Sequence, residues 1–215
     1  MDAATLQARI YAGYAKAAQR IGYTTNLYRA RSAINPTAAG NLVTTLPASF
    51  NPEDMGYSKP NKYGHPTWYG VFDGRLTKVG DYLINANDGT FFVAAQQQAL
   101  PILLVQCNRT LNVIRPQQQA GVGALGYGGD TAANETTLMT EWPASVLQGP
   151  KGEKSEVALP GDVKQPWWSV LMPAWAGVTI RGGDILADDL GRRYVVSSAE
   201  LTDLGWRMTA MQAQT

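Results

Sequence analysis

The stretch GGDILADDLGRRYVVSSAELTDLGWRMTAMQ, residues 182–212, reads as three short strands joined by two turns. A similar stretch, VGDYLINANDGTFFVAAQQQALPILLVQCN, occupies residues 79–108. Each stretch has Gly-Asp before an apolar strand, a second glycine at the hairpin turn, and then an aromatic and aliphatic run. Glycine suits such turns because it adopts a positive φ without steric cost. The repetition predicts a mainly β protein built from two related β-meander units.

The two units correspond at their turns, and aligning their second glycines places residues 92–95 opposite residues 194–197. The residues that we expect to form the turns are Gly80, Asp81, Gly89, Gly183, Asp184, Gly191 and Gly205. The repeat is compatible with two halves of one β-barrel or sandwich, and also with two barrels side by side.

Ahead of the repeat, residues 1–22 predict an N-terminal α-helix. Apolar residues recur there at i+4 spacing, Asp2 can accept N–H groups of the first turn, and Gly22 is typical of a helix end. Residues 23–68 are rich in proline and glycine and predict a long extended arm. Such an arm either wraps a neighbouring subunit or is a plain connector.

The rest of the chain, residues 69–215, predicts a β-barrel or sandwich domain. Apolar strand-like runs separated by turn residues dominate this part. A loop-rich insertion is expected at about 117–165, where glycine and polar residues interrupt the strand pattern.

The charge composition favours a surface covered by neighbours. Charged residues make up 16% of the 215-residue chain, below the roughly one quarter typical of soluble proteins. The net charge of +1 argues against general nucleic-acid coating. No signal peptide and no apolar run near the roughly 20 residues of a membrane span is found, so we expect a soluble protein made in the cytoplasm.

The N-terminal segment is more basic than the remainder. Residues 1–35 hold five basic residues and one acidic residue, whereas the remainder holds 13 basic and 16 acidic residues. This imbalance suggests that the helix reaches an acidic partner, although an ordinary solvated helix face accounts for it equally well. The residues expected to form such a docking surface are Leu6, Arg9, Ile10, Tyr14, Lys16 and Arg20.

We find no pattern typical of a catalytic, cofactor or metal site. The single histidine, His65, lies in a turn-rich segment, and the single cysteine, Cys107, lies in an apolar strand, so we expect structural roles for both. The G-x-G-x-x-G match at residues 121–126 lacks the strand and helix that a dinucleotide site needs.

A cluster of carboxylates near the C-terminus offers acid–base pairs or calcium ligands in principle. The carboxylates are Asp184, Asp188, Asp189, Glu200 and Asp203. Aspartate is also the usual polar residue of tight turns, and we prefer that interpretation. Four tryptophans in the same half of the chain are expected to pack in the core and at subunit interfaces. They are Trp167, Trp168, Trp175 and Trp206.

Residues 177–212 resemble small β-barrel neck proteins of tailed bacteriophages, which join the portal to the tail. The resemblance rests on a D-x-x-G-x-x-Y-x-V hairpin formed by Asp188, Gly191, Tyr194 and Val196, followed by Gly205. Residues 80–116 look like phage structural proteins of the same sort. The two stretches cover about a third of the chain. The chain is longer than typical stoppers, and its N-terminal helix and arm are more like adaptor or collar components.

The resemblance implies a structural virion protein of the head-to-tail connection, assembled in the host cytoplasm. It implies a six- or twelve-fold ring that contacts portal or adaptor and tail proteins, and that touches passing DNA without sequence specificity. No enzymatic activity, cofactor or membrane anchor is expected. Adaptor, stopper and collar roles stay open. The alternatives are a baseplate, tail-fibre or capsid-decorating protein, and a carbohydrate-binding module or enzyme.

Overall fold

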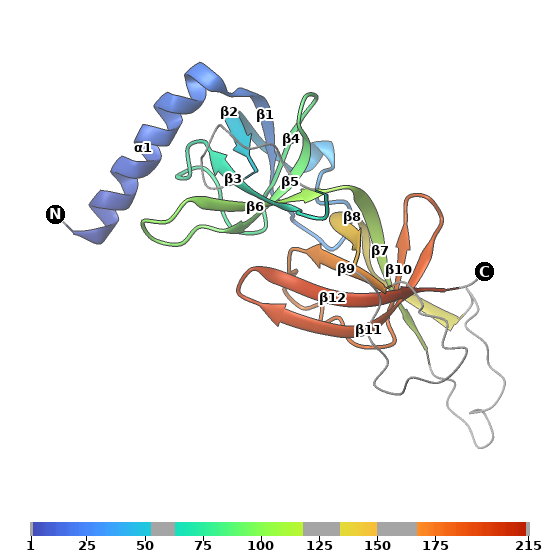
Figure 1. Ribbon diagram of the computed structural model, residues 1–215. Helices are drawn as coiled ribbons and strands as arrows, with labels where there is room; N and C mark the ends of the chain where they lie inside the picture. The colour runs from blue at the N-terminus through green and yellow to red at the C-terminus, as the bar shows by residue number, and fades with distance from the viewer. Residues whose placement is uncertain (1, 53–62, 118–133, 150–166, 214–215) are drawn as a thin grey trace, which may run out of the picture.

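The computed structural model describes residues 2–52, 63–117, 134–149 and 167–213, and it shows a mainly β protein with one N-terminal helix (Figure 1). Its elements are α1 (Ala3–Ile21), β1 (Tyr23–Tyr28), the 3₁₀ helix η1 (Ala39–Asn41), β2 (Leu42–Asn51), β3 (Thr67–Val71), β4 (Tyr82–Asn85), β5 (Gly89–Ala95), β6 (Ile102–Cys107), β7 (Arg109–Pro116), β8 (Glu135–Gln148), β9 (Trp167–Met172), β10 (Ile185–Asp188), β11 (Arg193–Thr202) and β12 (Gly205–Gln212). No helix in the described part is long and apolar enough to cross a membrane.

The strands form two closed six-stranded barrels with the same topology. The strand order is β1-β2-β3-β6-β5-β4 in the first barrel and β7-β8-β9-β12-β11-β10 in the second. The neighbouring strands pair antiparallel in both. The mainly β prediction and the N-terminal helix are confirmed. Of the two arrangements compatible with the repeat, the chain has two barrels side by side (Figure 1).

Residues 23–68 differ from the extended arm predicted for them. Strands β1 and β2 lie in this range, pair with each other and complete the first barrel. The buried residues Thr25 and Leu27 alternate with less buried neighbours in β1, which is a strand pattern too short to stand out between turn residues. The irregular loop between β1 and β2 packs against the second barrel, and residues 53–62 lie outside the described residues.

The predicted insertion at 117–165 also contains a barrel strand. Strand β8 pairs with β7 and β9 and is the longest strand of the described part. Pro143 lies within β8 although proline cannot donate a backbone hydrogen bond to a ladder. The predicted domain of residues 69–215 therefore does not form one barrel, because β4, β5 and β6 belong to the first barrel and β7 to β12 form the second. The remaining insertion residues, 118–133 and 150–166, lie outside the described part.

A buried aspartate holds the turn before the fourth strand of the first barrel. Asp81 is 2% exposed and accepts hydrogen bonds from Arg29 Nε and Nη2 at 2.8 and 2.6 Å. It also accepts the backbone N–H of Lys78 at 2.8 Å, while Arg29 Nη2 reaches the carbonyl of Leu76 at 3.1 Å. The bonds to Asp81 raise the pKa of the Arg29 guanidinium. We call this pair the first Arg–Asp clasp.

The second barrel repeats the clasp bond for bond. Asp184, 1% exposed, accepts from Arg115 Nε and Nη2 at 2.8 Å each and from the backbone N–H of Arg181 at 2.9 Å. Arg115 Nη2 also donates to the carbonyl of Thr179 at 2.7 Å. The hydrogen bonds to Asp184 raise the pKa of Arg115 as well. The two Gly-Asp turns are therefore equivalent structural sites.

The glycine before each aspartate has the same backbone role. Gly80 and Gly183 have φ values of 88° and 89°, in the left-handed region that favours glycine. Their N–H groups bond the carbonyls of Val93 and Val196, each at 2.8 Å. This pairing makes Val196 the counterpart of Val93, whereas alignment by the second glycines paired Val93 with Val195.

The one-residue difference comes from the next hairpin turn. Gly89 and Gly191 both have positive φ, at 90° and 77°. In the first barrel, Asn85 pairs with Gly89. Its counterpart in the second barrel, Asp188, instead donates its backbone N–H to the carbonyl of Arg192, which is one residue beyond Gly191. The glycines are both turn residues without being register equivalents. The third turn glycine, Gly205, has a φ of 110° and lies where a Cβ would be 2.6 Å from the carbonyl oxygen of Met172.

With the corrected register, the aromatic cores of the barrels also match. Trp68 lies edge-on to Phe91, with ring centroids 5.6 Å apart, and Trp168 lies edge-on to Tyr194 at 5.5 Å. Such T-shaped contacts are favourable for aromatic rings. Each pair joins the third strand of its barrel to the fifth, so the repeat extends from the turns into the packing.

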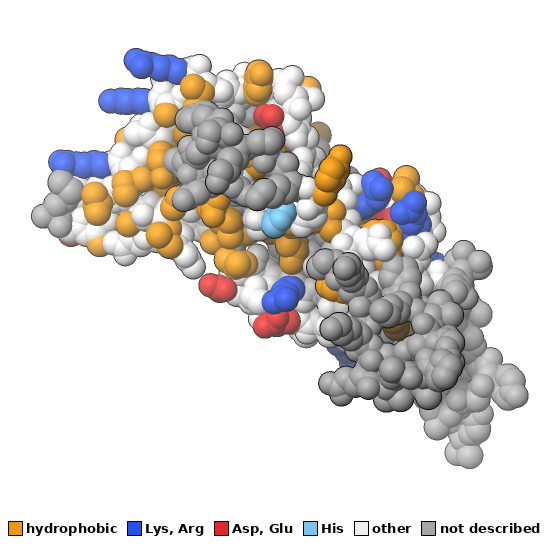
Figure 2. Space-filling view, viewed as in Figure 1, with side chains coloured by type: hydrophobic (Ala, Val, Ile, Leu, Met, Phe, Trp, Pro, Cys, Tyr) orange, Lys and Arg blue, Asp and Glu red, His pale blue; other side chains and the backbone are white. Residues whose placement is uncertain are grey.

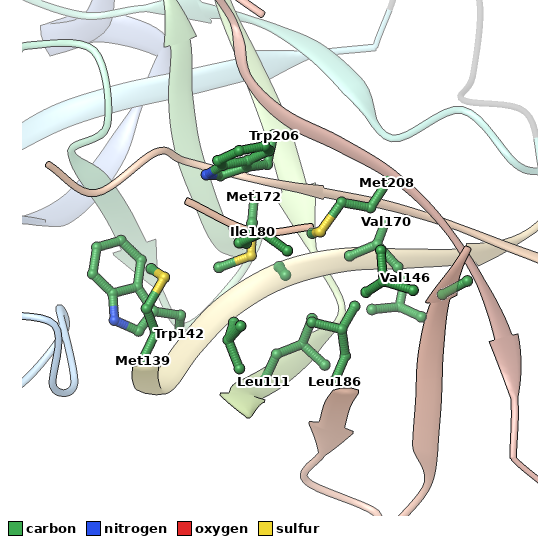
Figure 3. Close-up of a cluster of buried hydrophobic side chains, with 14 of the residues drawn as sticks. Leu111, Met139, Trp142, Val146, Val170, Met172, Ile180, Leu186, Trp206 and Met208 are labelled. Atoms are coloured by element: carbon green, nitrogen blue, oxygen red, sulfur yellow. The ribbon is translucent and has the colours of Figure 1, made fainter. Parts of the chain in front are cut away.

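The barrels are joined by polar bonds and a shared apolar cluster. Tyr82 Oη in the first barrel donates to the carbonyl of Pro143 at 2.9 Å, and Trp142 Nε1 in the second donates to the carbonyl of Ala33 at 2.7 Å. Phe92 and Trp206 belong to one buried cluster that spans both barrels. Figure 3 shows the side of this cluster that the second barrel supplies.

The clasps predict matched losses of stability. Asp81→Ala and Asp184→Ala should each lower the free energy of unfolding by about 2–3 kcal/mol, because each removes a charged acceptor that several donors share. Urea unfolding of the two variants would measure this. Asp73→Ala is the control, since Asp73 pairs with the exposed Arg75 and should matter little. A loss in only one of the two clasp variants would contradict their equivalence.

Candidate functional site

Helix α1 packs along the first barrel on strands β2 and β3. Asp2 caps its start by accepting the N–H of Thr5 at 2.7 Å. Hydrogen bonds from the side chain and the backbone of Thr5 lower the pKa of Asp2. Tyr11, 8% exposed, and Ala18, fully buried, form the centre of the packed face. Gly74 lies under the Tyr11 ring, where an added Cβ would be 2.7 Å from the ring. Tyr11 is thus the most deeply buried aromatic side chain of the helix.

The structure divides the residues predicted to form a docking surface. Ile10 and Tyr14 are half-buried and pack against the apolar core of the first barrel. Leu6 is 44% exposed. Tyr11, which the i+4 pattern missed, is the deeper anchor, and its spacing of seven from Ala18 was the available signal. Ile10 and Tyr14 of the predicted surface therefore pack on the helix's own barrel, whereas Leu6 stays exposed.

The cationic part of that surface points away from the barrel. Arg9, Lys16 and Arg20 are exposed, and at about 100° per residue they lie within a narrow arc opposite Tyr11 and Ala18. Figure 2 shows basic side chains projecting from the helix end of the molecule. Within the described part, no carboxylate forms an ion pair with these three residues. They form an uncompensated positive surface.

The aspartates of the C-terminal cluster serve turns. Asp188 accepts from the N–H groups of Leu190 and Arg192 at 3.0 and 2.7 Å, and from Tyr194 Oη at 2.9 Å. Burial, and then this bond to Asp188, raise the pKa of Tyr194. Asp189 accepts the N–H of Thr110 at 3.4 Å.

The other members of the cluster do not gather with them. Asp184 is held in the second clasp, and Glu200 and Asp203 are exposed around the β11–β12 turn. Within the described ranges, no group of three or more His, Cys, Asp or Glu residues is placed to hold a metal ion.

The single cysteine and the single histidine differ in burial. Cys107, at the end of β6, is partly buried beside the cluster shared by the barrels, and burial raises the pKa of its thiol far above the usual range. A thiol that stays protonated is a poor nucleophile. His65 is exposed in the loop before β3.

Two hollows are lined by described residues. A mostly apolar groove of about 240 Å³ lies between the barrels, lined by residues that include Phe92, Val105, Leu171 and Trp206. A wider, open hollow of about 730 Å³ lies beside the second clasp, with Arg181 in its lining. The cationic side of α1 is the more distinctive candidate site.

The anchoring of α1 can be tested at Gly74. Gly74→Val should displace the Tyr11 ring and release α1 from an otherwise folded barrel, because the new side chain would occupy the position of the ring. Tyr11→Ala should lower the free energy of unfolding by about 3 kcal/mol. Limited proteolysis with mass spectrometry would detect cleavage within α1. Gly40→Ala, at a position with open space, is the control and should leave α1 protected.

The repeated turns, the two clasps and the positive side of α1 are thus the distinctive features of the described structure. Comparisons with protein-family models, with curated proteins and with solved structures gave no match.

Proposed function

We propose that the protein is a structural component of a tailed-bacteriophage neck, assembling as a ring between the portal and the tail. The observation that carries the proposal is the use of the buried carboxylates. Among the described residues these are Asp81, Asp184 and Asp188, and each holds a turn or a clasp rather than a reaction centre. This use suits a scaffold and not an enzyme.

The resemblance to neck proteins gains a physical basis from the same hairpin. Asp188 accepts the hydroxyl of Tyr194 and two N–H groups of the turn, while Gly191 supplies the positive φ. The D-x-x-G-x-x-Y pattern is therefore a set of mutual contacts within one turn. The functional proposal builds on the resemblance of this pattern to that of small neck barrels.

The surface properties support assembly with neighbours. Large apolar residues such as Ile34 and Leu201 are more than half exposed, and charged residues are sparse. Ring subunits bury such surface against their own copies. A near-neutral chain also suits a channel in which DNA has to slide without tight binding. The proposal covers adaptor, stopper and collar roles alike.

The test is assembly with the portal. Full-length protein, alone and mixed with portal rings of the same phage, should give six- or twelve-fold complexes by native mass spectrometry. Cryo-electron microscopy of the virion should place the two barrels in the neck. A chain that stays monomeric with the portal, or density for it at the baseplate, the fibres or the capsid surface, would refute the neck assignment.

A further inference from the structure

We propose that one side of α1, formed by Arg9, Gly13, Lys16 and Arg20 and here called the cationic face, docks an acidic α-helix of a partner protein. This inference rests on the proposed function in that a connector needs a surface for its neighbour in the particle.

The cationic face is exposed, and no carboxylate of the described chain forms an ion pair with its three cations. Its four residues are exposed and share one narrow arc of the helix, opposite the buried Tyr11. Along the axis, Arg9 and Lys16 are separated by about 10 Å and Lys16 and Arg20 by about 6 Å. Glutamates spaced by one and two turns on a second helix would meet these charges in register.

The presence of glycine at position 13, between the cations, also favours a helical partner. It lies in the middle of α1, where glycine costs about 1 kcal/mol relative to alanine. An added Cβ at Gly13 would have nothing within 4 Å, so packing inside the chain does not require glycine there. Small residues let two helices approach more closely than the usual spacing. A glycine between cations therefore fits the close passage of a partner helix.

The charge pattern favours an acidic helix over the other acidic partners. Nucleic-acid surfaces generally need a broader basic patch, and the chain as a whole carries only +1. A membrane-binding helix would insert an apolar face, but the apolar face of α1 is turned to the barrel through Ile10, Tyr11 and Tyr14. The rim of the cationic face adds Leu6, which is partly exposed and available for an apolar contact.

The test uses the full-length protein and a synthetic, end-capped alanine–glutamate helix with glutamates at i, i+4, i+7 and i+11. Fluorescence anisotropy at low salt should detect binding to the wild type. The variant R9Q/K16Q/R20Q should bind at least about tenfold more weakly, because three charge pairs are lost. The matched control K78Q/R181Q/R207Q removes three exposed cations from the barrels and should bind like the wild type.

Gly13 provides an independent arm of the test. Gly13→Ala should raise the melting temperature and keep the binding, whereas Gly13→Trp should fold with α1 in place and lose it. No binding of the peptide, equal loss in the matched control, binding by Gly13→Trp, or preference for a short DNA duplex would each overturn the proposal. A protein that binds the peptide but forms no ring with the portal would instead refute the neck function alone.

Discussion

In each barrel, an Arg–Asp clasp lies at the seam where the sheet closes on itself. Closure requires the first strand to pair with the fourth, β1 with β4 and β7 with β10. Arg29 follows β1 and Asp81 precedes β4, while in the second barrel Arg115 is the penultimate residue of β7 and Asp184 precedes β10. Bringing together segments that are distant in the chain costs conformational entropy, and a bidentate ion pair with a buried carboxylate offsets part of that cost at the point of closure.

Away from these two seams, the barrels differ on their outer surfaces. Tyr82 and Phe92 lie on the outside of the first barrel and belong to the shared cluster, whereas their register counterparts in the second barrel are Ile185 and Val195. Val195 is partly exposed. The two barrels thus share a topology but differ in what their outer surfaces contact. The first barrel supplies aromatic rings to the joint between the barrels, and the second is free of that role at the equivalent position.

The sequence allowed the turns to be predicted, but not their partners. Gly-Asp followed by an apolar strand stands out in both copies because the turn needs local residues of specific types. Arg29 and Arg115 carry no such local mark. They lie 52 and 69 residues from their aspartates, so the two pairs are not found by a constant spacing. The second hairpin turn is built differently in the two copies, and this defeated alignment by glycines.

The candidate site was predictable in part for a similar reason. Residue type identified Arg9, Lys16 and Arg20 as an excess of positive charge, but the i+4 pattern assigned Ile10 and Tyr14 to the partner and overlooked Tyr11. Which side of a helix faces its own domain depends on the surface offered, here the space above Gly74. The strands β1, β2 and β8 were missed because tertiary pairing overrides a local abundance of turn residues and proline.

The link between the barrels is a single residue. Asn108 separates β6 from β7, and its side chain accepts the N–H of Val146 at 2.7 Å and donates to the carbonyl of the same residue at 2.9 Å. These two hydrogen bonds tie the connecting residue to β8 of the second barrel, so the connection is short and fixed. Force or torque applied at α1 would therefore be transmitted to the second barrel, because no flexible linker lies between the two barrels.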